Sequence, residues 1–288
     1  MKNVLVRLRE AMPSLSASER NVADFILKHP DEVKDCNIRL LASKTFTSPS
    51  GIVRLCRRFG FGGYRDFKQT LLLELMAFGK STSTEETLIL KDDPISAIIY
   101  KVTARNIRSM EDSRSLLDEE TVQKCIDHIV TCDRILFYGI GSSYCVANDA
   151  YLKFLRLNKN CMLNEDWHSQ LLTARNATPS DFAVVFSYSG QTEEMLECVR
   201  ALRENDTPCC AVTRYAPSPI AKLVDYNLYI SSTEPLFRNG AMSSRINQLN
   251  VIDILFSGYL NRNYESSIRQ LAMTHIAKST DPSEEPIY

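Results

Sequence analysis

Residues 182–205, FAVVFSYSGQTEEMLECVRALREN, contain the change of pattern that decides the fold. The apolar run at 182–186 is hydrophobic on both faces, which is typical of a central strand in a parallel sheet. The stretch 193–205 spaces its apolar residues as one face of a helix. A buried strand that runs through a short hydroxyl-rich turn into an amphipathic helix indicates one unit of an α/β domain.

The turn between that strand and that helix has the composition of an anion site. Backbone N–H groups and the positive end of the helix dipole attract negative charge there. Ser187, Ser189 and Thr192 can donate hydrogen bonds to phosphate oxygens, and Gly190 would let the backbone approach the ligand closely. The alternative interpretation is an ordinary capped helix start, because Ser and Thr favour such positions without any ligand.

A second unit of the same design, RILFYGIGSSY, occupies residues 134–144. Gly139 and Gly141 form its turn, and Ser142 and Ser143 begin the next helix. Because the carboxyl ends of parallel strands meet at one edge of a sheet, the two turns are expected to converge on one ligand. GIGSSY also begins like the dinucleotide motif GxGxxG, but the third glycine and the expected acidic residue are absent, so that interpretation is not favoured.

The rest of the second half repeats the alternation of strands and helices. β-rich runs at 208–213 and 226–231, and a shorter one at 159–164, are separated by helical stretches. This order predicts a parallel sheet with crossover helices.

The first 77 residues, called the head below, have a different pattern without strand-like alternation. Their periodicity and capping residues predict successive short helices, with Ser16 or Ser18 as a cap. The expected helices span 3–11, 17–28, 38–45, 49–59 and 64–77. Two further helical pieces at 94–130 are expected to break near Leu117 and Asp118.

Within the head, IRLLASKTFTSPSGIVRLCRRFGF at 38–61 predicts two helices joined by a tight turn at Phe46 and Thr47. Pro49 suits the first position of the second helix, whose core face carries Ile52 and Leu55. A small and arginine-rich opposite face is typical of a helix that enters the DNA major groove. The alternative is a helical hairpin with a solvated basic face. The residues expected to meet DNA are Ser48, Ser50, Gly51, Arg54, Arg57 and Arg58.

The charge balance differs between the head and the rest of the chain, which indicates different binding partners for the two parts. The head has 13 Lys or Arg and 8 Asp or Glu, whereas the remaining residues have 21 and 27. A basic head on an acidic body suggests that only the head meets a polyanion.

Composition excludes several classes of protein. No apolar run approaches the ~18 residues of a membrane helix, and the N-terminus is too charged for a secretory signal, so a cytoplasmic protein is expected. The nine cysteines form no CxxC pair and lie mostly in apolar runs. We therefore expect reduced packing cysteines, no metal site and no cofactor.

Both parts of the chain resemble domains of one known protein family. The head, above all IVRLCRRFGFGGYRDFK, resembles the helix-turn-helix domain of RpiR-type bacterial transcriptional regulators. It departs from many relatives at Phe46, where they have Gly, and at Gly51, where Thr is frequent. The stretch of about 118–260 is similar to the sugar isomerase (SIS) domain that follows the head in those regulators, through GIGSS, SYSGQT and EPLFRNGAMSSRINQLNVIDILF.

The resemblance implies a multidomain chain, an all-α head followed by an α/β domain with a five-stranded parallel sheet. It implies phosphate contacts from Ser143, Ser187, Ser189 and Thr192, and self-association to a dimer or tetramer. Neighbouring candidates for the sugar-phosphate site are Ser142, Gly190, Glu234, Ser244 and Arg245. The expected domains are 1–77 for DNA binding, 78–117 as linker and connecting helix, 118–270 as SIS domain and 271–288 as a polar tail.

The predicted function is a repressor of sugar or amino-sugar catabolism genes that binds double-stranded operator DNA and a phosphosugar effector without turnover. The alternative is a phosphosugar isomerase or lyase with an accessory helical domain, and a pure interaction module is a third class. An isomerase needs a positioned base. Carboxylate or imidazole groups that this alternative would use are Glu165, Asp166, His168, Glu193, Glu194 and Glu234, for which capping, surface or hydrogen-bonding roles are favoured.

Overall fold

The computed structural model describes residues 4–77, 89–231 and 241–276. No helix within these ranges is both long and apolar enough to cross a membrane.

The head is a compact set of helices, as expected. It contains α1 (Val4–Ala11), η1 (Met12–Ser14), α2 (Ala17–Lys28), α3 (Pro30–Val33), α4 (Ile38–Lys44), α5 (Pro49–Arg58) and α6 (Tyr64–Ala77). Sequence periodicity did not indicate η1 and α3, because a single turn is too short to display a helical repeat.

Capping and core packing explain this arrangement of helices. The Ser16 Oγ caps α2 by accepting from the Glu19 N–H, and the Glu19 carboxylate accepts from the Ser16 N–H, so the cap is a reciprocal capping box. Leu8, Leu41 and Leu55 are fully buried in one apolar core. Each helix therefore contributes one apolar face to a common centre.

The body follows the predicted alternation. α7 (Ile95–Leu116) and α8 (Glu119–Thr131) precede the sheet and are separated at the predicted break. The strands are β1 (Ile135–Gly139), β2 (Cys161–Leu163), β3 (Phe182–Phe186), β4 (Cys209–Arg214) and β5 (Tyr226–Ile230). The helices are α9 (Ser142–Leu155), α10 (Trp167–Arg175), α11 (Glu193–Glu204), α12 (Pro219–Leu223), α13 (Ser243–Arg262) and α14 (Tyr264–Met273).

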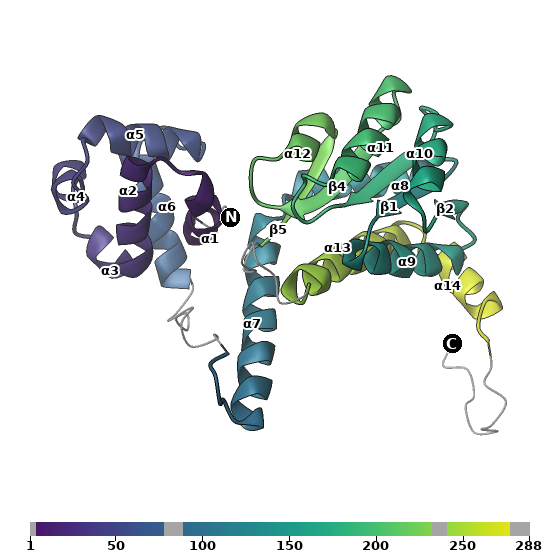
Figure 1. Cartoon of the computed structure of the whole chain (residues 1–288), viewed down its shortest axis with the longest axis horizontal. Helices are drawn as coiled ribbons and strands as arrows, with labels where there is room; N and C mark the ends of the chain where they lie inside the picture. Colours follow the sequence, from purple (N-terminus) through teal and green to yellow (C-terminus); the bar gives the residue numbers. More distant parts are fainter. Residues whose placement is uncertain (1–3, 78–88, 232–240, 277–288) are drawn as a thin grey trace.

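All strand pairs are parallel, and the order across the sheet is β2-β1-β3-β4-β5. Helices cover both faces: α8, α9 and α13 pack on one, and α10, α11 and α12 on the other. Figure 1 shows α9 and α13 below the sheet and α10, α11 and α12 above it. In β3, Val184 belongs to the first core and Val185 to the second. The predicted two-sided burial of this strand is confirmed.

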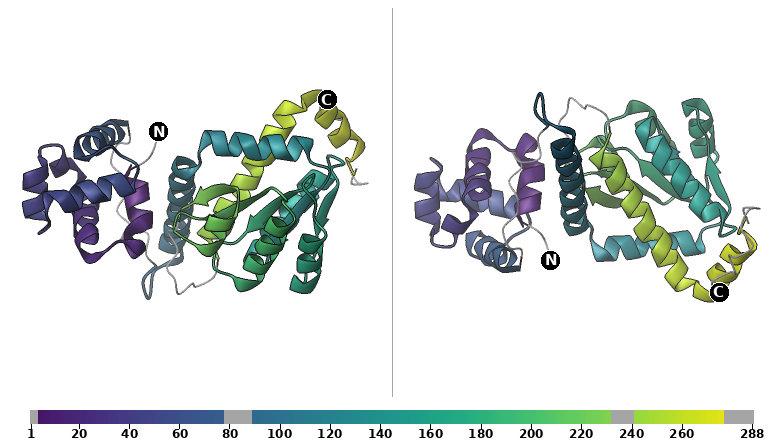
Figure 2. Two further views of the ribbon diagram at one scale, coloured as in Figure 1. Left: turned by 90° about the horizontal axis from the view of Figure 1, so that it is seen from above. Right: turned by 90° about the horizontal axis from the view of Figure 1, so that it is seen from below.

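The long helix α7 lies between the head and the sheet. Figures 1 and 2 show α1 of the head beside it on one side and the body on the other. α7 contacts α13 and β5 as well as α1. The helix that joins the two parts therefore also supports the edge strand of the sheet.

Candidate functional site

The two serine-rich turns lie at the point where the topology of the sheet changes direction. β1 and β3 are adjacent, but β1 leads into α9 on one face and β3 leads into α11 on the other. In a sheet of this order, a crevice opens between the carboxyl ends of these two strands, and ligands bind there. The expectation that the turns converge is therefore a consequence of strand order.

A cavity of about 150 Å³ occupies that crevice. At ~30 Å³ per water molecule it has room for a phosphoryl group with part of its substituent. Hydroxyl groups from both turns and apolar side chains form its wall. The lining residues are Ile140, Ser142, Ser143, Phe186, Ser187, Tyr188, Ser189, Thr192 and Met195.

The five predicted hydroxyl residues are thus brought together from two segments. Ser187 is 3% exposed, and its backbone N–H donates to the Val212 carbonyl, which anchors the turn to β4. The Ser189 Oγ accepts from the Gln191 N–H at 3.2 Å. Neither Gly141 nor Thr192, the N-cap residues of α9 and α11, caps its helix with a side chain. Both helix starts can therefore direct N–H groups and dipole toward an anion.

Gly190 lies in the same turn, and the structure requires glycine there for a different reason than the sequence indicated. Its φ is +63°, and an added Cβ would lie 2.2 Å from the Ser218 Oγ and 2.6 Å from the Ser218 Cβ. The backbone of the turn therefore needs glycine in order to fold against the N-cap of α12. The predicted close approach to the ligand is not required to explain it.

Gly139 is also held by packing. A Cβ there would lie 2.8 Å from the Ser143 backbone oxygen, so glycine lets the first turn of α9 pack on the end of β1. The apolar cavity wall, Ile140, Phe186, Tyr188 and Met195, escaped the sequence analysis. These four residues lie next to the serine-rich turns in the sequence, and that position could have indicated that they line the same cavity.

Two of the remaining candidates, Ser244 and Arg245, are not among the described residues that line this cavity. Ser244 is buried in α13, and Arg245 is exposed on the same helix. Glu234 lies outside the described residues.

The candidate catalytic groups within the described ranges are absent from the cavity lining. Glu165 and His168 are exposed, and Asp166 caps α10. Hydrogen bonds from Ser169 lower the pKa of Asp166. Glu193 forms a 2.8 Å ion pair with Arg200. Among the described cavity residues none carries a carboxylate or an imidazole.

In the head, α4, the turn and α5 form the predicted helix-turn-helix. Ser48 caps α5 by accepting from the Gly51 N–H at 3.1 Å, and Pro49 occupies the first turn. Ser50, Arg54 and Arg57 are exposed. Neither arginine makes a hydrogen bond or an ion pair with any part of the chain that the structure describes. Their guanidinium groups are available to bases or phosphates.

Two details of the predicted DNA face require correction. Gly51 is buried, with Ser48 and Ser18 its nearest neighbours, so its placement on the exposed face was wrong. The buried face of α5 therefore extends beyond its apolar residues to include Gly51, which lies close to Ser18 of α2.

Arg58 is exposed, but its guanidinium group already has partners within the head. It pairs with Glu19 at 3.1 Å and donates to the Ser14 carbonyl at 3.0 Å. Burial raises the pKa of Glu19, but hydrogen bonds from Ser16 and the charges of Arg58 and Arg54 outweigh it and lower that pKa. Arg58 therefore ties the end of α5 to α2.

The turn of this motif carries an unusual residue. Phe46 has a φ of +53° and is 94% exposed, so its ring gains little from packing. A left-handed backbone costs a non-glycine residue ~1–2 kcal/mol, and glycine removes that cost. Glycine also makes the unfolded chain more flexible, which offsets part of the gain. Replacement of Phe46 by glycine should therefore stabilise the head by about 0.5–1 kcal/mol. Hydrogen exchange of the α4 and α5 amides measures this change.

The matched reverse variant is Gly60→Ala, at φ +80° with no atom within 4 Å of the added Cβ. It should destabilise the same helices by about 1 kcal/mol. Faster exchange in Phe46→Gly than in the parent would contradict the argument and indicate a stabilising role of the ring.

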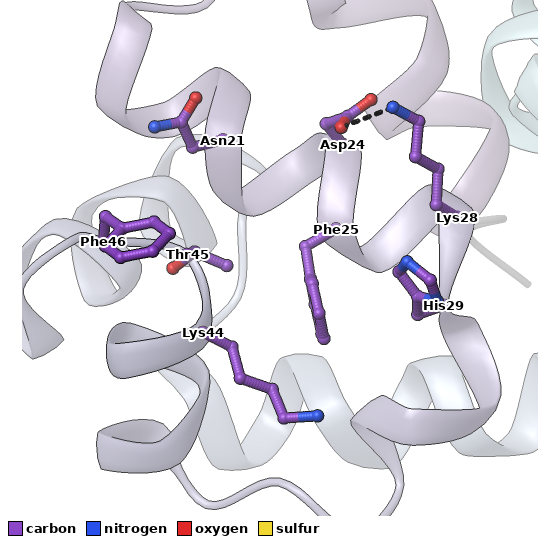
Figure 3. Close-up of a pocket in the computed structure, with 8 residues that line it drawn as sticks. All are labelled: Asn21, Asp24, Phe25, Lys28, His29, Lys44, Thr45 and Phe46. Carbon is purple, nitrogen blue, oxygen red and sulfur yellow. Dashed lines mark ion pairs between the residues drawn. The ribbon is translucent and has the colours of Figure 1, made fainter.

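A larger hollow of about 270 Å³ lies on the head, between α2, α4 and the turn (Figure 3). Its charged side chains are paired: Asp24 with Lys28 at 2.9 Å, and Lys44 with Glu32. Lys44 and His29 also flank the Phe25 ring. This is an open surface groove whose charges are neutralised, and we assign it no ligand.

Comparison with known proteins agrees with both parts of the chain. The model of the helix-turn-helix domain of the rpiR family matches residues 2–77, and the SIS domain model matches residues 128–258.

Relatives align with this chain across both parts. An uncharacterized HTH-type transcriptional regulator of Caldanaerobacter subterraneus subsp. tengcongensis is 36% identical over 95% of this chain and 96% of its own length. The HTH-type transcriptional regulator HexR of Pseudomonas aeruginosa is 33% identical over 90% and 89%. The structure of Vibrio vulnificus NanR complexed with ManNAc-6P matches with a TM-score of 0.58, 27% identity and coverage of 94% and 96%.

These matches confirm the predicted family and the predicted combination of an all-α head with an α/β domain. The chain therefore belongs to the rpiR family of HTH-type transcriptional regulators that carry a SIS domain.

Proposed function

We propose that this regulator represses genes of sugar or amino-sugar catabolism and that its SIS domain binds a phosphorylated sugar as effector. The observation that carries the proposal is the convergence of Ser142, Ser143, Ser187, Ser189 and Thr192 on one cavity at the switch point of the sheet. Hydroxyl donors and two helix starts suit a phosphate, and the apolar wall suits the carbon face of a sugar.

A relative supports the choice of effector class. The Vibrio vulnificus protein that spans nearly the whole chain is complexed with ManNAc-6P, an amino-sugar phosphate. Glu234, Ser244 and Arg245 are proposed as further contacts to the sugar. We propose that residues 1–77 bind DNA, that residues 118–270 bind the effector, and that residues 78–117 connect the two.

The effector is proposed to bind without turnover. An aldose–ketose isomerase needs a base within hydrogen-bond reach of the reacting carbon atoms. The described cavity wall offers hydroxyl and apolar groups. Relatives of the whole chain are named as transcriptional regulators.

We propose a cytoplasmic homodimer or tetramer as the active form. Two copies of α5 related by a two-fold axis would meet two half-sites of a palindrome about one helical turn apart. Ser48, Ser50, Arg54 and Arg57 are the proposed DNA contacts.

Fluorescence anisotropy of the full chain on DNA from upstream of its own and neighbouring genes tests the function. The titration is repeated with ManNAc-6P and a panel of hexose phosphates. Salt-dependent binding that one sugar phosphate shifts at least several-fold is the expected result. Consumption of a sugar phosphate without DNA binding would instead establish the enzyme alternative.

Ser189→Ala should weaken effector binding by about 10-fold or more, because a hydrogen bond to a charged group contributes ~1.5–3 kcal/mol. Calorimetric titration with the sugar phosphate identified in the anisotropy assay measures the change. Ser266→Ala, an exposed serine on α14, is the matched control. Equal affinity of the two variants would contradict the proposed phosphate contact.

A further inference from the structure

Buried polar side chains, joined in places by the backbone of α13 and α7, form a path from the cavity to the DNA-binding head. They come from five segments of the chain, and each is at most 9% exposed. The path, called the polar seam below, consists of Ser143, Gln248, Asn247, Ser109, Ser113, Ser231 and Glu10.

The seam begins at the cavity. The Ser143 Oγ, which lines the cavity, lies 3.4 Å from the Gln248 Oε1 on α13. This is a long contact, so Gln248 holds Ser143 only weakly. Asn247 is the preceding residue of α13, and its side chain reaches α7, another of the elements that pack on that helix. Its Nδ2 donates to the Ser109 Oγ at 2.7 Å.

The seam continues along α7 to the end of the sheet. One helical turn after Ser109, the Ser113 Oγ donates to the Ser109 carbonyl at 2.8 Å and accepts from the Ser231 N–H at 2.9 Å. Ser231 directly follows β5. α7 thus joins α13 to the carboxyl end of the edge strand through side-chain hydrogen bonds.

The last step crosses into the head. The Ser231 Oγ donates to the Glu10 Oε1 at 3.1 Å, and Glu10 belongs to α1. Glu10 is 2% exposed, and 221 positions of sequence separate the two partners.

Two arginines of α1 flank this junction. Arg9 pairs with Asp112 of α7 at 2.6 Å. Arg7 donates to the Tyr215 hydroxyl at 3.0 Å and to the Phe59 carbonyl at 2.8 Å. Since Phe59 ends α5, Arg7 connects the body to the helix proposed to read DNA.

Burial of so many polar groups is costly unless each is partnered, and a buried carboxylate is the most costly of them. Packing alone would be served as well by apolar side chains, as in the two sheet cores. A polar junction differs because its hydrogen bonds need defined distances, so a small shift of α13 or Ser231 changes how α1 docks.

We infer that the polar seam transmits effector binding to the DNA-binding head by changing how α1 docks on α7 and on the end of β5. The inference rests on the proposed function and deepens it. Occupation of the cavity repositions Ser143 and its neighbour α13, and the Ser231–Glu10 junction passes that change to α1 and, through Arg7, to α5. Spatial continuity alone does not establish coupling, so the test must measure the coupling itself.

Ser231→Ala removes the hydroxyl that reaches Glu10 and keeps the backbone N–H that reaches Ser113. Its coupling is the ratio of operator Kd with and without saturating sugar phosphate, measured by anisotropy on the full chain. Coupling in wild type is expected in the usual ~5–150-fold range. The variant should retain sugar-phosphate affinity, measured by calorimetry, while its coupling falls to about one third or less of the wild-type ratio.

Ser267→Ala is the control, since this serine is equally buried but lies on α14 outside the seam. Glu10→Leu is a second variant at the same junction; it removes the acceptor oxygens at similar volume and should also lose coupling. Wild-type coupling in both junction variants would overturn the inference and leave the proposed function intact. Absence of any sugar-phosphate effect in wild type would overturn both.

Discussion

The double variant Arg54→Ala/Arg57→Ala is expected to bind operator DNA about 100-fold more weakly than the parent. Each arginine of a groove-facing helix that contacts a base or phosphate is worth ~1–3 kcal/mol, so the loss of two from one chain costs ~2–6 kcal/mol, and about 100-fold lies toward the lower end of that range. Both side chains are exposed on α5 and unpaired within the described part of the chain, so their removal should leave the fold of the head unchanged. Anisotropy at several salt concentrations measures both the affinity and its salt dependence.

The matched control is Arg156→Ala/Arg175→Ala, which removes the same charge from exposed positions of the SIS domain. A similar loss in both double variants would mean that net charge alone governs binding. Unchanged affinity and salt slope in the α5 variant would contradict the placement of α5 in the groove. Arg58→Ala is expected to act differently, through stability, because Arg58 pairs with Glu19.

Gly190→Ala is expected to lower the free energy of unfolding of the SIS domain by about 3 kcal/mol and to abolish measurable effector binding. The left-handed backbone costs alanine ~1–2 kcal/mol, and relief of an overpacked contact costs a further ~1–3 kcal/mol. The contact cannot be relieved by a side-chain rotation alone, since the Ser218 Cβ also lies within 2.6 Å of the new atom. Urea unfolding followed by circular dichroism and calorimetric titration with the sugar phosphate check the two effects.

Gly63→Ala is the matched control, because Gly63 has no atom within 4 Å of an added Cβ and no positive φ. Its free energy of unfolding should change by less than about 1 kcal/mol. If Gly190→Ala were as stable as this control, the turn would have to accept a different backbone conformation from the one described.

These two variants separate the two parts of the proposed function. The α5 variant should lose DNA and keep the sugar phosphate, whereas the Gly190 variant should lose the sugar phosphate. The seam variants at Ser231 and Glu10 should keep both ligands and lose the communication between them.

The sequence by itself determined most of the local structure. Helical and strand periods, caps such as Ser16 and Ser48, and the change from a helical head to an α/β body are set by neighbouring residues, and the predicted elements agree with those described within about two residues. The five hydroxyl residues of the cavity were also readable, because each lies in the turn that follows a strand or at the start of the next helix.

The tertiary structure decided what depends on residues that are distant in the chain. Strand order places β1 beside β3 and so creates the crevice. Contact with Ser218 explains Gly190, contact with Glu19 engages Arg58, and packing near Ser18 buries Gly51. The bond from Ser231 to Glu10 spans most of the chain. Local sequence patterns report which face of an element is apolar, but they do not report which distant element packs on it, and that packing decides each of these roles.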